Sequence, residues 1–97
     1  MNAVITGASR GIGKAIAEVF ATHGYDLYLS SRNENHLLDT INELKSKFPN
    51  ISINGQAFDL GIKQQAQLFG EWIITNVDVI DVLINNAGSF IPGNISD

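Results

Sequence analysis

The sequence predicts an α/β fold: a doubly wound parallel sheet of about four strands with three helices. Short apolar runs alternate with segments whose apolar residues recur at helical spacing, which is the pattern of parallel strands joined by helical crossovers. A glycine-rich stretch, residues 6–13, separates the first apolar run from the first helical segment. Right-handed crossovers in such a sheet give the strand order 3-2-1-4.

The first strand and the first helix flank the glycine-rich stretch. The strand is expected over Asn2–Thr6, because three apolar residues follow one another there. The helix is expected over Gly11–His23, and Gly24 follows it at the position favoured for a left-handed cap. The apolar residues of this helix recur at helical spacing; they are Ile12, Ala15, Ile16, Val19 and Phe20.

The second strand is expected over Asp26–Ser31 and the second helix over Glu34–Phe48. Asn33 is the expected N-cap of this helix, and Pro49 ends it. One face of the helix is apolar and is expected to pack on the sheet; it carries Leu37, Leu38, Ile41, Leu44 and Phe48.

A third strand, a third helix and a fourth strand complete the pattern. We expect them over Ile51–Phe58, Ile62–Thr75 and Val79–Asn85, and residues 88–97 as a loop. The third helix is expected to bury Ala66, Phe69, Trp72 and Ile73.

The glycine-rich stretch predicts a phosphate-binding site. A helix N-terminus presents unpaired N–H groups and the positive end of its dipole. Glycines let the backbone turn tightly and approach a pyrophosphate closely. The alternative is an ordinary tight turn, but the flanking strand and helix supply the context that the binding motif requires. The expected binding residues are Gly7, Ser9, Arg10, Gly11, Ile12 and Gly13.

Composition narrows the classes of protein. The 97 residues form one small domain, in which 44% hydrophobic and 16% charged residues suffice for a packed core. A net charge of −4 argues against nucleic-acid binding. The chain has no cysteine, which excludes disulfides and cysteine metal sites, and no metal is expected. Because neither a signal peptide nor an apolar membrane span is recognisable, a cytoplasmic protein without a membrane partner is expected.

The end of the second strand indicates which dinucleotide would bind. Proteins that bind NAD place an acidic residue about 20 residues after the glycine turn, where it binds the ribose hydroxyls. This chain has Ser31 and Arg32 there instead. A guanidinium can bind a 2′-phosphate with two hydrogen bonds, so NADP(H) is preferred over NAD(H), with Arg10 as a second candidate. The alternative is that both arginines are solvated surface residues.

Two motifs together resemble the short-chain dehydrogenase/reductase family. Residues 6–13 have the spacing T-G-x-x-x-G-x-G, and Asn85-Asn86-Ala87-Gly88 follows at about the separation found in the family. The resemblance covers the whole chain. It implies a Rossmann-like domain of which residues 1–97 are the N-terminal, cofactor-binding part, without the catalytic part. It also implies NAD(P)-dependent transfer of a hydride between nicotinamide and a carbonyl or alcohol.

The same resemblance implies further cofactor contacts. Asp59 would accept a hydrogen bond from the adenine amino group, and the Leu60 N–H would face the ring. The alternative is that Asp59 caps the third helix. Asn86, Ala87 and Gly88 would stabilise the sheet and let the backbone pass close to the nicotinamide-side ribose, the alternative being a generic asparagine-rich turn.

The catalytic residues that the resemblance implies, a Tyr-x-x-x-Lys pair with a serine and an asparagine, are not carried by this chain. Tyr25 and Tyr28 are followed four residues later by Leu29 and Arg32. In a strand, Tyr28 and Arg32 are roughly 13 Å apart, against about 6 Å for one helical turn. We therefore expect the cofactor-binding fragment of an NADP(H)-dependent oxidoreductase, inactive alone. The alternative is a complete small protein that binds nucleotide or associates with itself without catalysis.

The fourth strand predicts self-association. In the family a further strand would pair beside it, whereas here residues 79–84 would form an exposed apolar edge. This edge lacks the proline, lysine or bulge that prevents pairing. A second copy could pair antiparallel across a two-fold axis, with Phe69 and Trp72 as candidate contacts. A homodimer or larger assembly through the fourth-strand edge is therefore expected.

Overall fold

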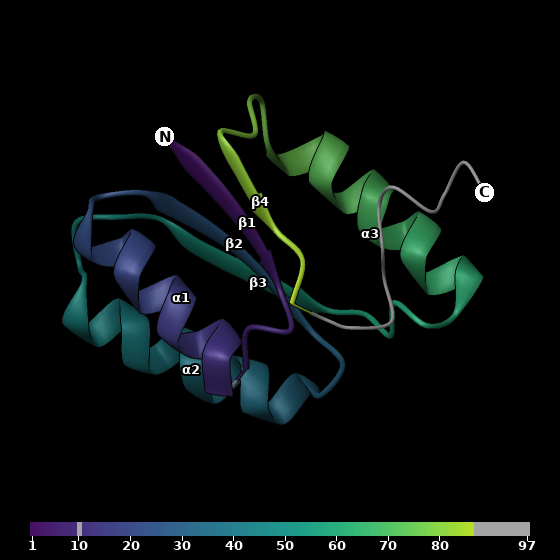
Figure 1. Ribbon diagram of the computed structural model, residues 1–97, viewed down its shortest axis with the longest axis horizontal. Helices are drawn as coiled ribbons and strands as arrows, with labels where there is room; N and C mark the ends of the chain where they lie inside the picture. The colour runs from purple at the N-terminus through teal and green to yellow at the C-terminus, as the bar shows by residue number, and fades with distance from the viewer. Residues whose placement is uncertain (10, 87–97) are drawn as a thin grey trace.

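The computed structural model describes residues 1–9 and 11–86. These residues form a parallel sheet with helices on both faces. The strands are β1 (Asn2–Thr6), β2 (Asp26–Ser31), β3 (Ile53–Ala57) and β4 (Val82–Ile84), and the helices are α1 (Gly11–Thr22), α2 (Glu34–Lys47) and α3 (Lys63–Asn76). The strand order is β3-β2-β1-β4, with every pairing parallel, so the predicted fold class and order are confirmed. Helices α1 and α2 cover one face and α3 the other (Figure 1).

The central strand β1 is buried on both faces. Ala3 and Ile5 belong to the cluster formed with α1 and α2, whereas Val4 between them packs with α3. This alternation follows from the period of two of a strand. All three side chains are fully buried. A strand covered on both faces reads as a continuous apolar run, which is why β1 could be recognised in the sequence.

Small residues bring α1 close to the sheet. Its buried residues are Gly13, Ala17 and Ala21, which recur every four residues. Ile12 and Val19 are 71% and 56% exposed. Ile16 and Phe20 pack at the side of the core cluster, so only part of the expected apolar face points towards the sheet, and the residues in closest contact with it are small.

Helix α2 begins as predicted. The Asn33 side chain accepts a hydrogen bond from the His36 N–H at 2.9 Å, which caps the helix. The expected apolar face is confirmed with one exception, since Leu38 is 48% exposed.

The left-handed conformation expected of Gly24, which follows α1, is also confirmed, with φ at +80°.

Strand β4 is shorter than predicted: it spans Val82–Ile84 rather than Val79–Asn85. Ahead of it, the Asn2 side chain donates to the Val79 carbonyl at 2.9 Å. The Asn2 N–H donates to a carboxylate oxygen of Asp81 at 2.7 Å. These bonds accompany a single backbone bond, from the Asp81 N–H to the Asn2 carbonyl at 3.0 Å, and the strand itself begins after Asp81. Strand β3 is likewise shorter than the predicted Ile51–Phe58.

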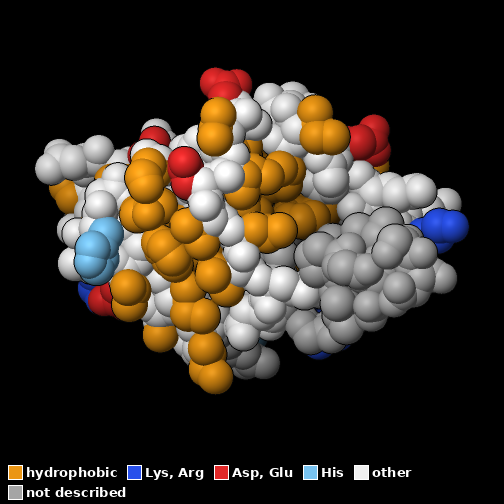
Figure 2. Space-filling model, turned by 45° about the horizontal axis from the view of Figure 1, so that its top comes forward, with side chains coloured by type: hydrophobic (Ala, Val, Ile, Leu, Met, Phe, Trp, Pro, Cys, Tyr) orange, Lys and Arg blue, Asp and Glu red, His pale blue; other side chains and the backbone are white. Residues whose placement is uncertain are grey.

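The outer edge of β4 and the adjacent face of α3 form an apolar groove of about 540 Å³. Leu83 of β4 is 44% exposed, and Ile74 of α3 is 81% exposed. Figure 2, in which this edge is turned forward, shows hydrophobic side chains gathered across the face. No described residue pairs with the outer edge of β4. None of the helices in the described ranges has the length and apolar character of a membrane span.

The aromatic residues of α3 pack inside the chain. Phe69 is 4% exposed, and its ring lies 5.6 Å from that of Phe58. Trp72 is partly buried, and the centroid of its ring lies 6.0 Å from that of Phe58 and 6.3 Å from that of Tyr28. The expected burial of Phe69 by the third helix is confirmed, so Phe69 does not offer the contact with a second copy for which it was a candidate.

Candidate functional site

A cleft of about 320 Å³ lies at the carboxyl ends of the four strands, next to the point where the strand order reverses. In open α/β sheets this is the place where ligands bind. Residues that follow β1, β2, β3 and β4 all contribute to it. The lining residues are Gly7, Ser9, Ser30, Ser31, Arg32, Asn33, His36, Phe58, Asp59, Leu60 and Asn86.

Most of the site residues predicted from the sequence meet in this cleft. Seven of them line it: Gly7, Ser9, Ser31, Arg32, Asp59, Leu60 and Asn86. Gly11, Ile12 and Gly13 form the first turn of α1. Arg10, Ala87 and Gly88 lie outside the described residues.

The glycine turn leaves no room for a side chain at Gly13. A Cβ there would overlap the carbonyl oxygen of Gly7 and would lie 2.8 Å from Nδ2 of Asn86. That Nδ2 atom donates to the Gly7 carbonyl at 3.3 Å. Gly7 and Gly11 have φ angles of +62° and +64°, which other residues rarely adopt. The turn therefore requires glycine both for its shape and for its packing.

Residues from both ends of the described chain meet beside this turn. The Asn86 N–H donates to Oγ1 of Thr6 at 3.0 Å, across 80 residues of sequence. Oγ1 of Thr6 also bonds to Oδ1 of Asn85 at 3.0 Å. The asparagine pair thus fixes the segment after β4 to the start of the glycine turn.

The end of β2 holds the turn from the other side. The Ala8 N–H donates to the Ser30 carbonyl at 3.1 Å. Oγ of Ser31 donates to Oγ of Ser9 at 2.8 Å and accepts the Asn33 N–H at 3.3 Å. Ser31 is 7% exposed, so it serves the structure of the turn as well as lining the cleft.

Arg32 and Ser30 offer unused hydrogen-bonding groups at the cleft. Arg32 is exposed, and no ion pair joins it to another described residue. Ser30 is 1% exposed, and its hydroxyl has no hydrogen-bond partner among the described residues. A buried polar atom without a partner is uncommon in proteins, and it indicates a place for a ligand or a water molecule.

Asp59 does not cap α3, so that alternative is wrong. The N-cap of α3 is Ile62, which makes no side-chain capping bond. One carboxylate oxygen of Asp59 accepts the Gly61 N–H at 3.1 Å, and its carbonyl accepts the Ile62 N–H at 3.0 Å. The chain makes a separate turn here before the helix begins, and Asp59 lines the cleft.

Four residues that line the cleft were not predicted as site residues: Ser30, Asn33, His36 and Phe58. Ser30 and Phe58 adjoin predicted site residues, so the expectation that strand ends meet could have included them. Asn33 is expected from the sequence only as the cap of α2, and His36 lies in the first turn of that helix. The position of that helix end beside the cleft depends on how α2 packs, which sequence spacing does not reveal.

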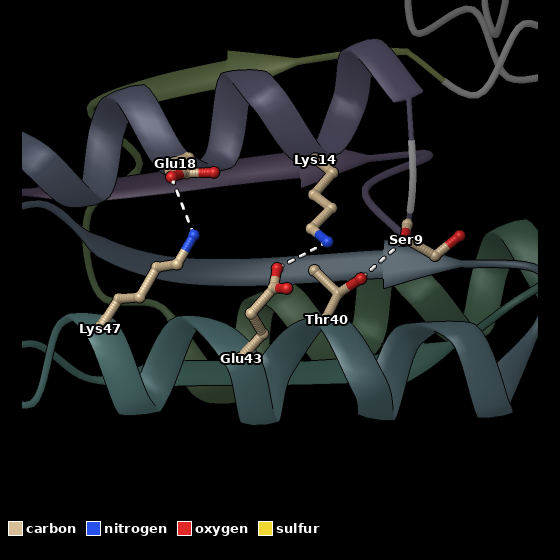
Figure 3. Close-up of polar contacts among 6 residues, drawn as sticks. All are labelled: Ser9, Lys14, Glu18, Thr40, Glu43 and Lys47. Carbon is tan, nitrogen blue, oxygen red and sulfur yellow. Dashed lines mark hydrogen bonds and ion pairs between the residues drawn. The ribbon is translucent and has the colours of Figure 1, made fainter.

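Two ion pairs and one hydrogen bond join α1 and its preceding turn to α2 (Figure 3). Nζ of Lys14 lies 2.6 Å from a carboxylate oxygen of Glu43, and Nζ of Lys47 lies 3.3 Å from Glu18. The hydrogen bond from Lys14, together with its charge, lowers the pKa of Glu43. The side chains of both pairs are partly exposed to solvent, so their contribution to stability is small.

Comparison with known proteins gives concordant matches. The sequence model of the family described as short chain dehydrogenase matches residues 1–97. The 7alpha-hydroxysteroid dehydrogenase of Escherichia coli K12 is 38% identical over 93 residues, which cover 89% of this chain and 33% of the relative. The chain spans about a third of the length of the curated relatives it matches.

Solved structures match in fold as well. YwfH, described as an NADPH-dependent reductase involved in bacilysin biosynthesis, has a TM-score of 0.83 at 33% identity, covering 88% of this chain and 35% of YwfH. The L-sorbose reductase of Gluconobacter frateurii, solved with NADPH and L-sorbose, has a TM-score of 0.81 at 35% identity, covering 88% and 32%. The similarity therefore extends over nearly all of the described chain.

Proposed function

Because the chain belongs to the short-chain dehydrogenase family, we propose that residues 1–97 are the N-terminal, NADP(H)-binding part of an oxidoreductase. The nicotinamide of such a cofactor gives or accepts a hydride at a carbonyl or alcohol carbon of the substrate. The observation that carries the proposal is the glycine turn beside the cleft, where Gly13 has no space for a Cβ. The turn is followed at once by the N-terminus of α1.

The turn and α1 fit a pyrophosphate. The first N–H groups of α1 have no partner within the helix, and the helix dipole favours an anion at this end. Gly11 and Gly13 allow the backbone to come close to the phosphates, and the Ser9 hydroxyl lines the same cleft. Ile12, which is 71% exposed, would contact the cofactor beside the first turn.

Arg32 supports a preference for NADP(H) over NAD(H). It lies at the cleft immediately after β2 and forms no ion pair with the described residues, so its guanidinium is available for a 2′-phosphate. Ser31 occupies the position where an acidic residue would favour NAD. YwfH and the L-sorbose reductase are described with NADPH. Arg10 remains the second candidate for this phosphate.

Asp59 and Leu60 support an adenine site on the far side of the cleft. One carboxylate oxygen of Asp59 is bound by the Gly61 N–H, which leaves the other for the adenine amino group. We assign Asn86, with Ala87 and Gly88, to the ribose on the nicotinamide side. The Asn86 N–H is held by Thr6, so the chain leaves β4 at a fixed place beside the glycine turn.

The substrate would be bound and turned over by residues beyond those described. The relatives are about three times as long as this chain. The two tyrosines, Tyr25 and Tyr28, pack against Phe20 and Trp72, and neither is followed by a lysine four residues later. We therefore propose that residues 1–97 bind cofactor without turnover when alone. We also propose that the protein is located in the cytoplasm.

Calorimetric titration of the 97-residue chain tests the proposal. NADPH is expected to bind at least tenfold more tightly than NADH, because the 2′-phosphate adds a charge-assisted contact with Arg32. Adenosine 2′,5′-bisphosphate, which keeps this contact, should compete with NADPH, and adenosine 5′-monophosphate should compete weakly. The same sample should not oxidise NADPH in the presence of carbonyl substrates. Equal affinity for NADPH and NADH, or turnover that survives repurification, would contradict the proposal.

We also propose that the chain associates with itself through the outer edge of β4. The exposed apolar side chains there support this, in particular Leu83 and Ile80 of the groove and Ile74 on α3. An antiparallel pairing of two β4 strands across a two-fold axis would satisfy the open N–H and C=O groups of both copies.

Sedimentation velocity at micromolar concentration is expected to show a dimer or a larger species. Leu83→Lys should shift the chain to monomer, because a charge in the groove would be desolvated on pairing. Leu83 is a better site for this test than Val82, which packs against the core on the opposite face. Leu68→Lys is the matched control, since Leu68 is 50% exposed and lies outside the groove. A wild-type chain that sediments as a clean monomer would refute the association.

A further inference from the structure

A buried hydroxyl in the middle of α2 contacts the glycine turn. Thr40 is 2% exposed, and its Oγ1 donates to the Ser9 carbonyl at 2.6 Å, 31 residues away in sequence (Figure 3). A threonine hydroxyl inside a helix commonly bonds to a carbonyl of its own helix. Here the hydroxyl bonds to another segment. It thereby joins the second helix to the turn that leads into the first.

Ser9 is consequently held at two of its atoms. Thr40 fixes its carbonyl from α2, and Ser31 donates to its hydroxyl oxygen from β2 at 2.8 Å. The preceding Ala8 N–H is bound to the Ser30 carbonyl. With Ser31 as the donor, the Ser9 hydroxyl proton has no acceptor among the described residues, and Ser9 lines the cleft. That proton is thus available to an anion in the cleft.

The neighbours of Ser9 explain why such a restraint matters. Gly7 and Gly11 have positive φ angles and, as glycines, have many alternative conformations open to them. A turn that moved among these conformations would have to be ordered each time an anion bound, and that ordering would weaken binding. The Thr40 bond fixes the Ser9 carbonyl, two residues after Gly7, before any ligand arrives.

We propose that Thr40 is a positioning residue for the cofactor's phosphates: it acts through Ser9 and does not itself touch the ligand. The inference rests on the proposed cofactor site and deepens it, because it extends the binding machinery into the core-facing side of α2. Its distinguishing property is that the hydroxyl matters and not the volume of the side chain. Valine has nearly the same shape as threonine but cannot donate.

The test compares Thr40→Val with Thr40→Ser in the 97-residue chain. Calorimetry at a temperature where every variant is folded is expected to give Thr40→Val a Kd for NADPH about tenfold higher than wild type, the order of one lost hydrogen bond. Thr40→Ser should stay within about twofold, because it keeps the donor. Ile41→Val is the matched control: Ile41 is buried and adjoins Thr40 in sequence, but its side chain has no hydrogen-bonding group, so the Kd for NADPH should not change.

Amide hydrogen exchange without ligand separates this inference from the proposed function. The Ala8 amide, which bonds to the Ser30 carbonyl, should exchange faster in Thr40→Val than in Thr40→Ser or Ile41→Val. If wild type does not bind NADPH, the proposed function fails, and this exchange comparison still decides whether Thr40 orders the turn. Unchanged exchange at Ala8, or a Thr40→Val Kd within twofold of wild type, would overturn the inference.

Discussion

Gly13→Ala is expected to lower the free energy of unfolding by about 3 kcal/mol or more, the upper range for an overpacked site. The added Cβ would overlap the Gly7 carbonyl oxygen and would press on Nδ2 of Asn86. Neither neighbour can move freely. The Gly7 oxygen is a backbone atom, and Nδ2 of Asn86 is hydrogen-bonded to that same oxygen. Urea unfolding followed by circular dichroism measures the change. The phosphate turn should also lose its affinity for NADPH where the variant is still folded.

Gly70→Ala provides the control for this prediction. Gly70 lies inside α3, and a Cβ added there would meet nothing within 4 Å. Alanine is favoured over glycine within helices, so this variant should gain about 0.5–1 kcal/mol. A Gly13→Ala chain as stable as wild type would show that the turn is loosely packed, and the pyrophosphate site would lose its structural basis.

Arg32→Asp is expected to change the ratio of the NADPH and NADH dissociation constants by about a hundredfold in favour of NADH. The variant loses the charge-assisted contact to the 2′-phosphate and places a carboxylate where it repels that phosphate. The same carboxylate can accept hydrogen bonds from the ribose hydroxyls of NADH. Paired titrations with both cofactors measure the ratio. Because Arg32 is exposed, the variant should unfold at nearly the wild-type urea concentration.

Lys45→Asp is the matched control, since it changes the net charge by the same amount. Lys45 lies in the last turn of α2, about 16 Å along the helix from Glu34, and does not line the cleft. The cofactor ratio of this variant should remain at the wild-type value. A ratio that moved equally in both variants would mean that the preference follows overall charge and not the guanidinium at the cleft.

Much of the fold could be predicted because its signals are local. The apolar run of β1, the Asn33 cap and the left-handed Gly24 each depend on a few neighbouring residues, and all three are confirmed. The bounds of β4 could not be predicted, because the segment before the strand is held by backbone and side-chain bonds to Asn2, and Asn2 lies 79 residues away from Asp81. The exposure of Ile12 and Val19 likewise follows from the tight packing of α1, which periodicity alone does not contain.

The candidate site shows the same division. Strand ends of a parallel sheet meet at one edge, so the gathering of Ser9, Ser31 and Asp59 follows from topology. The roles of Ser30 and Thr40 do not. Both have hydroxyls with several possible partners in an α/β protein. Only the packed structure shows that Thr40 bonds to the turn and that Ser30 has no partner among the described residues.

The bond between the Asn86 N–H and Thr6 has a kinetic consequence. It joins residues 80 positions apart, whereas β1, α1 and β2 form a nearly continuous local unit. Closing so long a loop carries an entropic cost that must be met before its contacts are gained. The β1–β2 unit can therefore form early in folding, while the cleft is complete only when β4 docks. A refolding chain would acquire most of its secondary structure before it acquires a finished binding site.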